Sequence, residues 1–116
     1  MREKISACIT AGNEEQKIER CLSSLTWCDE IVVVDSFSRD RTVEISRTFT
    51  DRVYQHEWLG YVGQKNLIRG MARYPWVLFV DADEEVSAEL RDEILARFER
   101  GVENVSGFRM PRQVFY

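Results

Sequence analysis

The sequence contains no long hydrophobic run. Its longest strongly apolar stretches, residues 31–34 and 76–80, are far shorter than the roughly 20 residues that a helix needs to cross a bilayer. Residues 1–4 are mostly charged and do not begin a secretory signal, which requires an apolar region. We therefore expect a cytoplasmic protein without a transmembrane segment.

Basic clusters and cysteine pairs are also lacking. The chain has 16 Lys and Arg against 20 Asp and Glu, a net charge of -4, and this balance disfavours a nucleic-acid backbone or an anionic membrane as the main partner. Its three cysteines show neither CxxC nor Cys/His ligand spacing. We expect Cys8, Cys21 and Cys28 to be reduced packing residues, without zinc or a disulfide.

Several catalytic and nucleotide-binding motifs are missing as well. The sequence has no G-x-G-x-x-G after a strand-like segment and no G-x-x-x-x-G-K-[ST], so neither a common dinucleotide fold nor a P-loop NTPase is supported. The single histidine, His56, has no Ser or Cys elbow near it. A nucleophilic triad is therefore not indicated, and we expect His56 to be a surface or loop residue.

Apolar strand-like segments alternate with helix-like segments along the chain. The strands are expected at 5–10, 31–34, 52–54, 76–80 and 107–110. Runs that are apolar at every position suit a sheet covered on both faces, with helices as the right-handed connections. We predict an α/β fold, a single domain over residues 1–116 with a mostly parallel, Rossmann-like sheet and helices on both faces.

Capping residues and apolar periodicity locate the helices. Asn13, with Gln16 three residues later, is typical of an N-cap, and the buried stripe of that helix is Ile18, Cys21, Leu22 and Leu25. Asp40 is the expected cap of the second helix, and the third is expected around residues 67–72. Ser87 is expected to cap the fourth, whose inner stripe is Leu90, Ile94 and Phe98.

Polar groups follow three of the expected strands. Residues 12–14 follow the first, Asp35 and Ser36 the second, and the acidic run 81–85 the fourth. Each has a simpler explanation by itself, as a helix cap, a turn or a solvated helix entry. The carboxyl ends of parallel strands share one edge of the sheet, where ligands bind. Carboxylates crowded there are costly unless a cation or a hydrogen-bonding ligand joins them.

Asp81 and Asp83 point to a metal and a diphosphate. Two residues apart in extended backbone, they would lie on the same side, roughly 6–7 Å apart. Mg²⁺ takes one or two protein carboxylates and completes its octahedron with water and phosphate oxygens. We predict a Mg²⁺ or Mn²⁺ site here, with Glu84 and Glu85 as surface acids. Lys65 and Asn66, at the expected start of the third helix, could reach a nucleotide.

Segments 6–15 (SACITAGNEE), 31–42 (IVVVDSFSRDRT), 64–66 (QKN) and 77–85 (VLFVDADEE) together resemble the donor half of family 2 glycosyltransferases of the GT-A fold. Among these, the bacterial lipopolysaccharide-core glucosyltransferases are the most similar. The resemblance extends over nearly the whole chain in family order and spacing. A D-x-D alone is a weak signal, but it is specific when combined with the asparagine-glutamate turn and the aspartate after the second strand.

The resemblance implies inverting transfer of a sugar from a nucleoside diphosphate donor, usually UDP-linked, to a lipopolysaccharide, another glycan or a lipid-linked acceptor. It also implies a place at the cytoplasmic face of the inner membrane. By the same resemblance, Asp35 would accept a hydrogen bond from the base, Asp81 would hold the ribose and Asp83 the metal. The other implied donor contacts are Ala11, Asn13, Glu14, Lys65, Asn66 and Ala82.

Three departures from the family pattern bear on function. Gly12 stands where a basic residue is common and Phe37 where glycine is common, which affects loop shape and phosphate contacts. The general base of the family comes from a later acidic motif, whereas residues 109–116 contain no carboxylate. We therefore expect a C-terminally truncated chain with negligible transfer activity. The expected last strand, with Val114, Phe115 and Tyr116, would expose an apolar edge that promotes self-association.

Two other functions remain open from the residues alone. A receiver-like signalling domain also places carboxylates around Mg²⁺ at strand ends, but it needs paired acids after the first strand and a lysine after the last. A non-catalytic nucleotide-sugar-binding module would need only the donor site.

Overall fold

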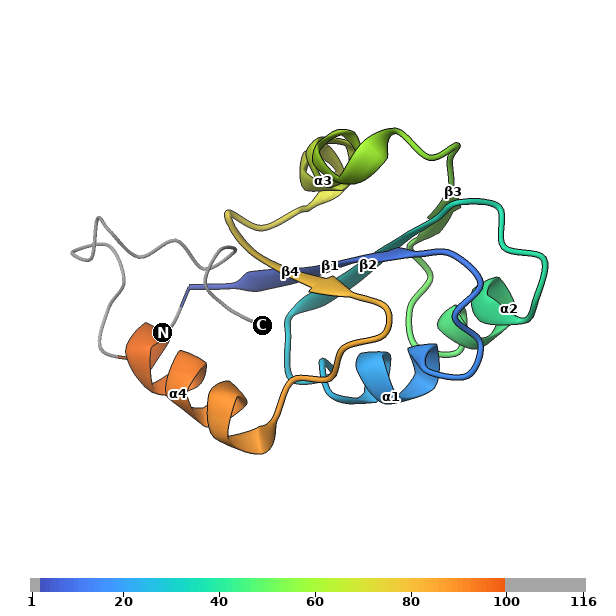
Figure 1. Cartoon of the computed structure of the whole chain (residues 1–116). Coiled ribbons are helices and arrows are strands. Elements are labelled where there is room, and N and C mark those ends of the chain that lie inside the picture. Colours follow the sequence, from blue (N-terminus) through green and yellow to red (C-terminus); the bar gives the residue numbers. More distant parts are fainter. Residues whose placement is uncertain (1–2, 100–116) are drawn as a thin grey trace.

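The computed structural model describes residues 3–99, which form one parallel sheet flanked by helices (Figure 1). The sheet order is β3-β2-β1-β4, and every strand pair is parallel. This arrangement confirms the predicted α/β fold class. The strand expected at 107–110 lies outside the described residues. In chain order, the elements are β1 (Ile5–Ala11), α1 (Ile18–Ser23), β2 (Glu30–Asp35), α2 (Thr42–Ser46), β3 (Val53–Gln55), α3 (Gly60–Met71), β4 (Trp76–Asp81) and α4 (Ala88–Glu99).

The register brings polar strand ends together. In the pairing of β1 with β2, Ala11 lies opposite Asp35, and in the pairing of β1 with β4, Thr10 lies opposite Asp81. On the far side of β2, Asp35 lies opposite Gln55 of β3. All four strands therefore end at the same edge, as the sequence predicts for a parallel sheet.

Two hydrophobic clusters hold the helices to the sheet. Figure 1 shows α3 on one face and α1, α2 and α4 on the other. Side chains alternate along β1, so that Ile5, Ala7 and Ile9 pack toward the three-helix face, whereas Cys8 packs with Ile68 of α3. Burying apolar side chains on both faces is the main stabilising term for such a layered fold.

The cysteines are packing residues, as expected. Cys8 and Cys21 are buried within the two hydrophobic clusters, and Cys28 is partly buried against the larger one. Burial first, and nearby carboxylates second, raise the pKa of Cys8 and of Cys21 to about 12. Both thiols therefore stay protonated and unreactive at neutral pH.

The predicted cap of α1 is wrong. Asn13 has a positive φ of 53°, and its Oδ1 accepts a hydrogen bond from the backbone N–H of Arg39, 2.8 Å away. The regular helix begins later, at Ile18, and the N-cap position is Lys17, which makes no side-chain capping bond. Asparagine tolerates this left-handed conformation better than most residues, so it serves a turn here instead of a helix end.

The other helix starts agree in part. Ser87 Oγ accepts from the backbone N–H of Leu90, which confirms the cap of α4. Asp40 Oδ1 accepts from the N–H of Thr42, although Arg41 occupies the N-cap position of α2. The third helix starts at Gly60, earlier than predicted. No helix within residues 3–99 is long and apolar enough to cross a membrane.

Candidate functional site

A cleft of about 410 Å³ opens where the strands end. It contains six of the nine residues that the sequence predicted as donor or metal contacts, and Asp35, Lys65 and Asn66 are not among its lining residues. The predicted residues that line it are Ala11, Asn13, Glu14, Asp81, Ala82 and Asp83, and the others are Thr10, Gly12, Ser36, Trp58 and Tyr61.

The carboxylates Asp81 and Asp83 sit on a tight turn. The backbone N–H of Glu84 donates to the carbonyl of Asp81, 2.9 Å away, and the Glu84 carboxylate accepts from the Asp81 N–H at 3.0 Å. The predicted extended backbone after β4 is therefore wrong, because the chain folds back at Ala82. Both aspartates are exposed and line the cleft on this turn.

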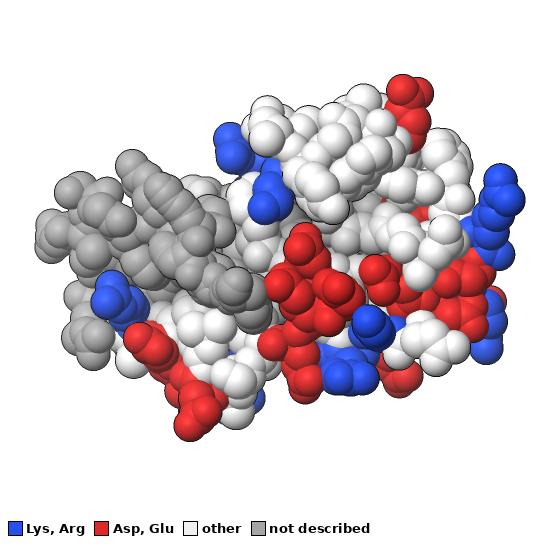
Figure 2. All heavy atoms as spheres, viewed as in Figure 1, with Lys and Arg blue, Asp and Glu red and all other residues white. Residues whose placement is uncertain are grey.

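Negative charge accumulates around the cleft. Burial, reinforced by Asp83, raises the pKa of Glu14, with Lys17 acting in the opposite direction. Burial also raises the pKa of Glu84. The hydrogen bond from the Asp81 N–H opposes this rise, the charges of Asp81 and Asp83 add to it, and the Lys65 charge opposes it. Figure 2 shows acidic side chains gathered below α3 on this face of the molecule. A bound cation would relieve this repulsion.

The donor set fits a metal that is shared with a ligand. Within residues 3–99, no three carboxylate, histidine or cysteine side chains gather into a protein-only metal cage. The exposed carboxylates of Asp81 and Asp83 supply hard oxygen ligands. Mg²⁺ in phosphate-binding sites is held by one or two protein carboxylates, and water and phosphate oxygens fill its remaining coordination positions. Two carboxylates are therefore enough for such a site.

Asp35 is fully buried below the turn that follows β2. One carboxylate oxygen accepts from the backbone N–H of Ser38 at 2.7 Å and from Gln55 Nε2 at 3.3 Å, and the other accepts from the Ser38 hydroxyl. Phe37 reaches this turn with a positive φ of 54°, at the position where the family commonly has glycine. In this structure, the Asp35 carboxylate holds the turn and does not line the cleft.

Two hydroxyl groups connect the loop after β2 to the loop after β1. Ser38 Oγ donates to Asp35 and accepts from the backbone N–H of Asn13 at 2.7 Å. Thr42 Oγ1 donates to Asp40 and accepts from the backbone N–H of Glu14 at 2.8 Å. Each hydroxyl thus links a carboxylate of one loop to a cleft-lining residue of the other, and a hydroxyl polarised by a carboxylate is a better acceptor.

Lys65 and Asn66 lie in the middle of α3, contrary to the prediction that they begin the helix. Both are exposed, and Lys65 Nζ lies 5.7 Å from the centre of the Phe79 ring. The Lys65 charge partly offsets the rise in the pKa of Glu84, so it contributes to the electrostatics of the acidic turn. His56, expected to be a loop residue, follows β3, with Nδ1 2.9 Å from the Glu57 carbonyl oxygen.

Sequence reasoning missed the aromatic lining of the cleft. Trp58, just before α3, and Tyr61, in its first turn, line the cleft, and their rings meet edge to face, with centroids 5.1 Å apart. A signal was present in the sequence, because the tryptophan and the tyrosine lie three residues apart on either side of Gly60. Ser36, which the sequence placed among the polar groups after the second strand without giving it a role, lines the cleft as well.

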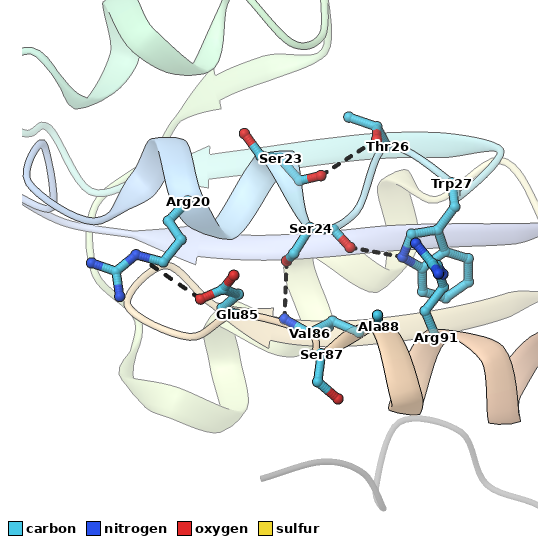
Figure 3. Close-up of a pocket in the computed structure, with 10 residues that line it drawn as sticks. All are labelled: Arg20, Ser23, Ser24, Thr26, Trp27, Glu85, Val86, Ser87, Ala88 and Arg91. Atoms are coloured by element: carbon cyan, nitrogen blue, oxygen red, sulfur yellow. Dashed lines mark hydrogen bonds and ion pairs between the residues drawn. The ribbon is translucent and has the colours of Figure 1, made fainter.

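A second hollow, of about 370 Å³, lies between α1 and α4 (Figure 3). Ser24 is its central contact, since its Oγ accepts from the Val86 N–H at 2.9 Å and its carbonyl accepts from Trp27 Nε1 at 2.7 Å. Arg20 and Glu85 are 4.0 Å apart across the same hollow. These groups bond one another and anchor the chain after the acidic turn to α1, so we assign this hollow a structural role.

The sequence of the chain matches a known protein family. The sequence profile of glycosyl transferase family 2 matches residues 6–115. The lipopolysaccharide core biosynthesis glycosyltransferase LpsC of Rhizobium meliloti is 34% identical over 116 residues, which cover 96% of this chain and 43% of LpsC. An uncharacterized glycosyltransferase of Rickettsia bellii is 46% identical over 95 residues, 81% of this chain and 32% of that protein. The chain therefore spans less than half the length of these relatives.

Solved structures agree with the sequence comparison. A crystal structure of S. aureus TarS residues 1–349 matches with a TM-score of 0.70 and 30% identity, covering 84% of this chain and 32% of TarS 1–349. The same TarS fragment in complex with UDP matches with a TM-score of 0.64 and 27% identity, over 84% and 32% of the two chains. The predicted family and fold class are thus confirmed, and the chain belongs to glycosyl transferase family 2.

Proposed function

We propose that the cleft binds a nucleoside diphosphate sugar, specifically a UDP-sugar, together with Mg²⁺ or Mn²⁺, as the donor site of an inverting glycosyltransferase. The observation that carries this proposal is the pair of exposed carboxylates, Asp81 and Asp83, in a cleft at the ends of β1 and β4. The structural match to TarS in complex with UDP supports the choice of nucleotide.

The residues that line the cleft suggest which of them would contact each part of the donor. The turn from Ala11 to Glu14 would follow the nucleoside, and Asp81 would hold the ribose hydroxyls. Asp83 would bind the metal, and buried Ala82 would keep this part of the wall small. Lys65, on the exposed side of α3, would reach the nucleotide from above, with Asn66 beside it.

Asp35 contributes through the turn that it holds. Its carboxylate bonds Ser38, and Ser38 bonds the backbone of Asn13 in the cleft. The base hydrogen bond that the resemblance implies for Asp35 would require one of these contacts to yield. We propose that Asp35 acts on uridine binding in either way, through the turn or after such an exchange.

Asp83 and Asp81 would hold a divalent cation in this site. When bound, the cation would neutralise the diphosphate, which the acidic cleft would otherwise repel, and would stabilise the charge of the departing UDP without needing a proton. The protein's part is to hold the ligand oxygens of Asp83 and Asp81 on a turn closed by the Glu84 hydrogen bonds.

The acceptor and the compartment remain proposals. We propose transfer to a lipopolysaccharide or another glycan or lipid-linked acceptor at the cytoplasmic face of the inner membrane, on the basis of the relationship to LpsC, which is named for lipopolysaccharide core biosynthesis. The expected C-terminal edge, with Val114, Phe115 and Tyr116, lies outside the described residues, and self-association through it stays a proposal.

Isothermal titration calorimetry of the 116-residue chain tests the donor proposal. UDP and UDP-glucose are titrated with and without Mn²⁺, and ADP serves as the nucleotide control. We expect UDP and UDP-glucose to bind more tightly with metal, and ADP to bind more weakly than UDP. Equal affinity for UDP and ADP, or no heat with either uridine ligand at saturating metal, would contradict the proposal.

A further inference from the structure

The segment that joins β3 to α3 and the first turn of α3 carry two aromatic side chains, Trp58 and Tyr61, that belong to neither hydrophobic cluster. Trp58 is 49% exposed and Tyr61 76% exposed, although both line the cleft. By contrast, Trp27 and Trp76 pack against the larger core cluster and Phe79 against the smaller one. Aromatic rings left in solvent give little to folding, so their position calls for another explanation.

This segment is nevertheless held in one conformation. Gly60 has a φ of +86°, which a residue with a side chain rarely adopts. An added Cβ at Gly63 would lie 2.8 Å from Leu59 Cβ, so the helix and the preceding turn approach as closely as glycine allows. Two glycine-dependent features thus fix the place of an exposed pair of rings.

Gln64 provides a third constraint. Its side chain is buried, with Oε1 accepting from the Leu59 N–H at 3.0 Å and Nε2 donating to Ser36 Oγ at 3.1 Å. One amide therefore connects the turn next to Trp58 with a residue of the cleft at the end of β2. The rings hold their position relative to the cleft through the fold's own hydrogen bonds.

The strand order shows which part of a ligand these rings would meet. Along the edge β3-β2-β1-β4, Trp58 follows β3 at one end, while Asp81 ends β4 and Asp83 follows it at the other. A diphosphate held by metal at the β4 end would extend its nucleoside along the β1 turn toward β2 and β3. The flat base then comes to the end of the cleft where Trp58 stands.

We propose that Trp58 and Tyr61 form an aromatic wall that stacks on the pyrimidine base of the donor, and that they determine a large share of the affinity for the nucleoside. This inference rests on the proposed function, since it assigns the base end of the same cleft. The edge-to-face contact, at an interplanar angle of 89°, braces the two rings against each other. Base–aromatic stacking needs no charge, so it suits the end of the cleft away from the acidic turn.

Substitution of the wall, with a matched control, tests the inference. Trp58→Ala and Tyr61→Ala should each weaken binding of uridine and of UDP by roughly tenfold. Trp58→Phe, which keeps a ring, should retain most of the affinity. Val62→Ala is the control, because Val62 is 74% exposed beside Tyr61 but does not line the cleft. Thermal melts of each variant check that it folds.

Fluorescence adds a direct signature. Uridine, which has no diphosphate, should quench tryptophan emission of the wild-type chain, and Trp58→Phe should remove this quenching while Trp27 and Trp76 remain. If the wild type binds UDP and both alanine variants bind uridine and UDP equally well, the inference is overturned and the proposed function stands. A loss confined to UDP-glucose would assign the wall to the sugar and also overturn it. No UDP binding by the wild type would overturn both.

Discussion

Glu30 and Asp83 are both carboxylates at strand ends, but their surroundings differ. The Glu30 side chain is buried at the start of β2 and accepts from Ser6 Oγ and Arg52 Nη1, each at 2.6 Å, and from the Arg73 N–H at 2.8 Å. Asp83 is exposed beside other acids. A satisfied buried carboxylate stabilises a fold, whereas an exposed one among like charges is suited to binding a cation.

Glu30→Gln should destabilise the chain at neutral pH. Burial alone would raise the pKa of Glu30, but the hydrogen bonds from Ser6, Arg73 and Arg52 outweigh it and lower the pKa below 4.5. The stabilisation is therefore present above pH 4.5 and is lost as the pH falls below it. We expect a loss of about 2 kcal/mol in urea unfolding at pH 7.

The pH dependence of the stability difference between the wild type and Glu30→Gln tests whether the charge of Glu30 is the cause. The difference between the wild type and Glu30→Gln should shrink as the pH falls from 5 to 3. Glu44→Gln is the control, since its ion pair with Arg41 is exposed and should matter little. A difference that stays constant with pH would show that the charge of Glu30 is not what stabilises the fold.

Glu84→Gln should stabilise the ligand-free chain at neutral pH, in contrast to the destabilisation expected for Glu30→Gln. A pKa raised in the folded chain means that the protonated carboxyl is favoured, so the contribution of Glu84 is full below pH 4.5 and is lost as the pH rises. Glutamine keeps the oxygen that accepts from the Asp81 N–H but removes the charge. Melts at pH 7 should show a higher midpoint for Glu84→Gln, and melts at pH 4 a smaller difference. A lower midpoint at pH 7 would contradict the electrostatic explanation.

Asp83→Asn should abolish the metal dependence of UDP binding. Asparagine retains the shape of the side chain but loses the charge that attracts a divalent cation. Calorimetric titration of UDP should then give the same affinity with and without Mn²⁺. Glu85→Gln is the matched control, because Glu85 is exposed, pairs with Arg20 and does not line the cleft. Unchanged metal dependence in Asp83→Asn would show that the metal binds elsewhere.

At the scale of elements, the loops after β1 and β2 act as one unit. The hydroxyls of Ser38 and Thr42 each donate a hydrogen bond to a carboxylate at the end of β2 or in the loop after it. Each also accepts one from a backbone N–H in the cleft, that of Asn13 for Ser38 and that of Glu14 for Thr42. Their removal would leave those N–H groups without a protein acceptor and would free the turn that faces the nucleotide. The two loops should therefore lose order together when either hydroxyl is lost.

Ser38→Ala and Thr42→Val should each cost about 1 kcal/mol of stability and weaken UDP binding. Thr42→Ser keeps the hydroxyl and should restore affinity, which separates the hydrogen bond from general packing. Thr48→Val is the control, since the Thr48 hydroxyl bonds only the nearby Ile45 carbonyl among the described contacts. Thermal melts and UDP titrations report the two effects. If Thr42→Ser binds UDP as weakly as Thr42→Val, the hydroxyl link is not the cause.

Elements whose signals lie within a few neighbouring residues could be predicted from the sequence. Strands such as 31–34 were predictable because they are apolar at every position, and Ser87 was predictable because its cap depends only on neighbours three residues away. The role of Asn13 was not, because its partner Arg39 is remote in sequence. Asp83 was found through a local motif, whereas the wall of Trp58 and Tyr61 is defined only once α3 is placed over the sheet.

At the scale of the whole molecule, the described residues carry the cleft that we propose as the donor site of this glycosyl transferase family 2 chain. The relatives are longer, since the chain covers 32% of the Rickettsia bellii protein. Among the described residues we assign a donor cleft but no general base for an acceptor hydroxyl, so we expect the 116-residue chain to bind UDP-glucose with negligible transfer to a glycan or lipid acceptor and slow hydrolysis of the donor. Chromatography of the products from radiolabelled UDP-glucose measures both. Turnover onto an acceptor at the rate of a full-length relative would contradict this expectation.

We propose that this cleft binds a uridine diphosphate through a metal held at the end of β4. Thermal unfolding of the 116-residue chain with UDP, with and without Mn²⁺, tests this proposal directly. With metal and UDP at 100 times its dissociation constant, we expect about 2.7 kcal/mol of added stability, and a much smaller shift when EDTA removes the metal. A melting temperature that does not move at saturating UDP and metal would contradict it.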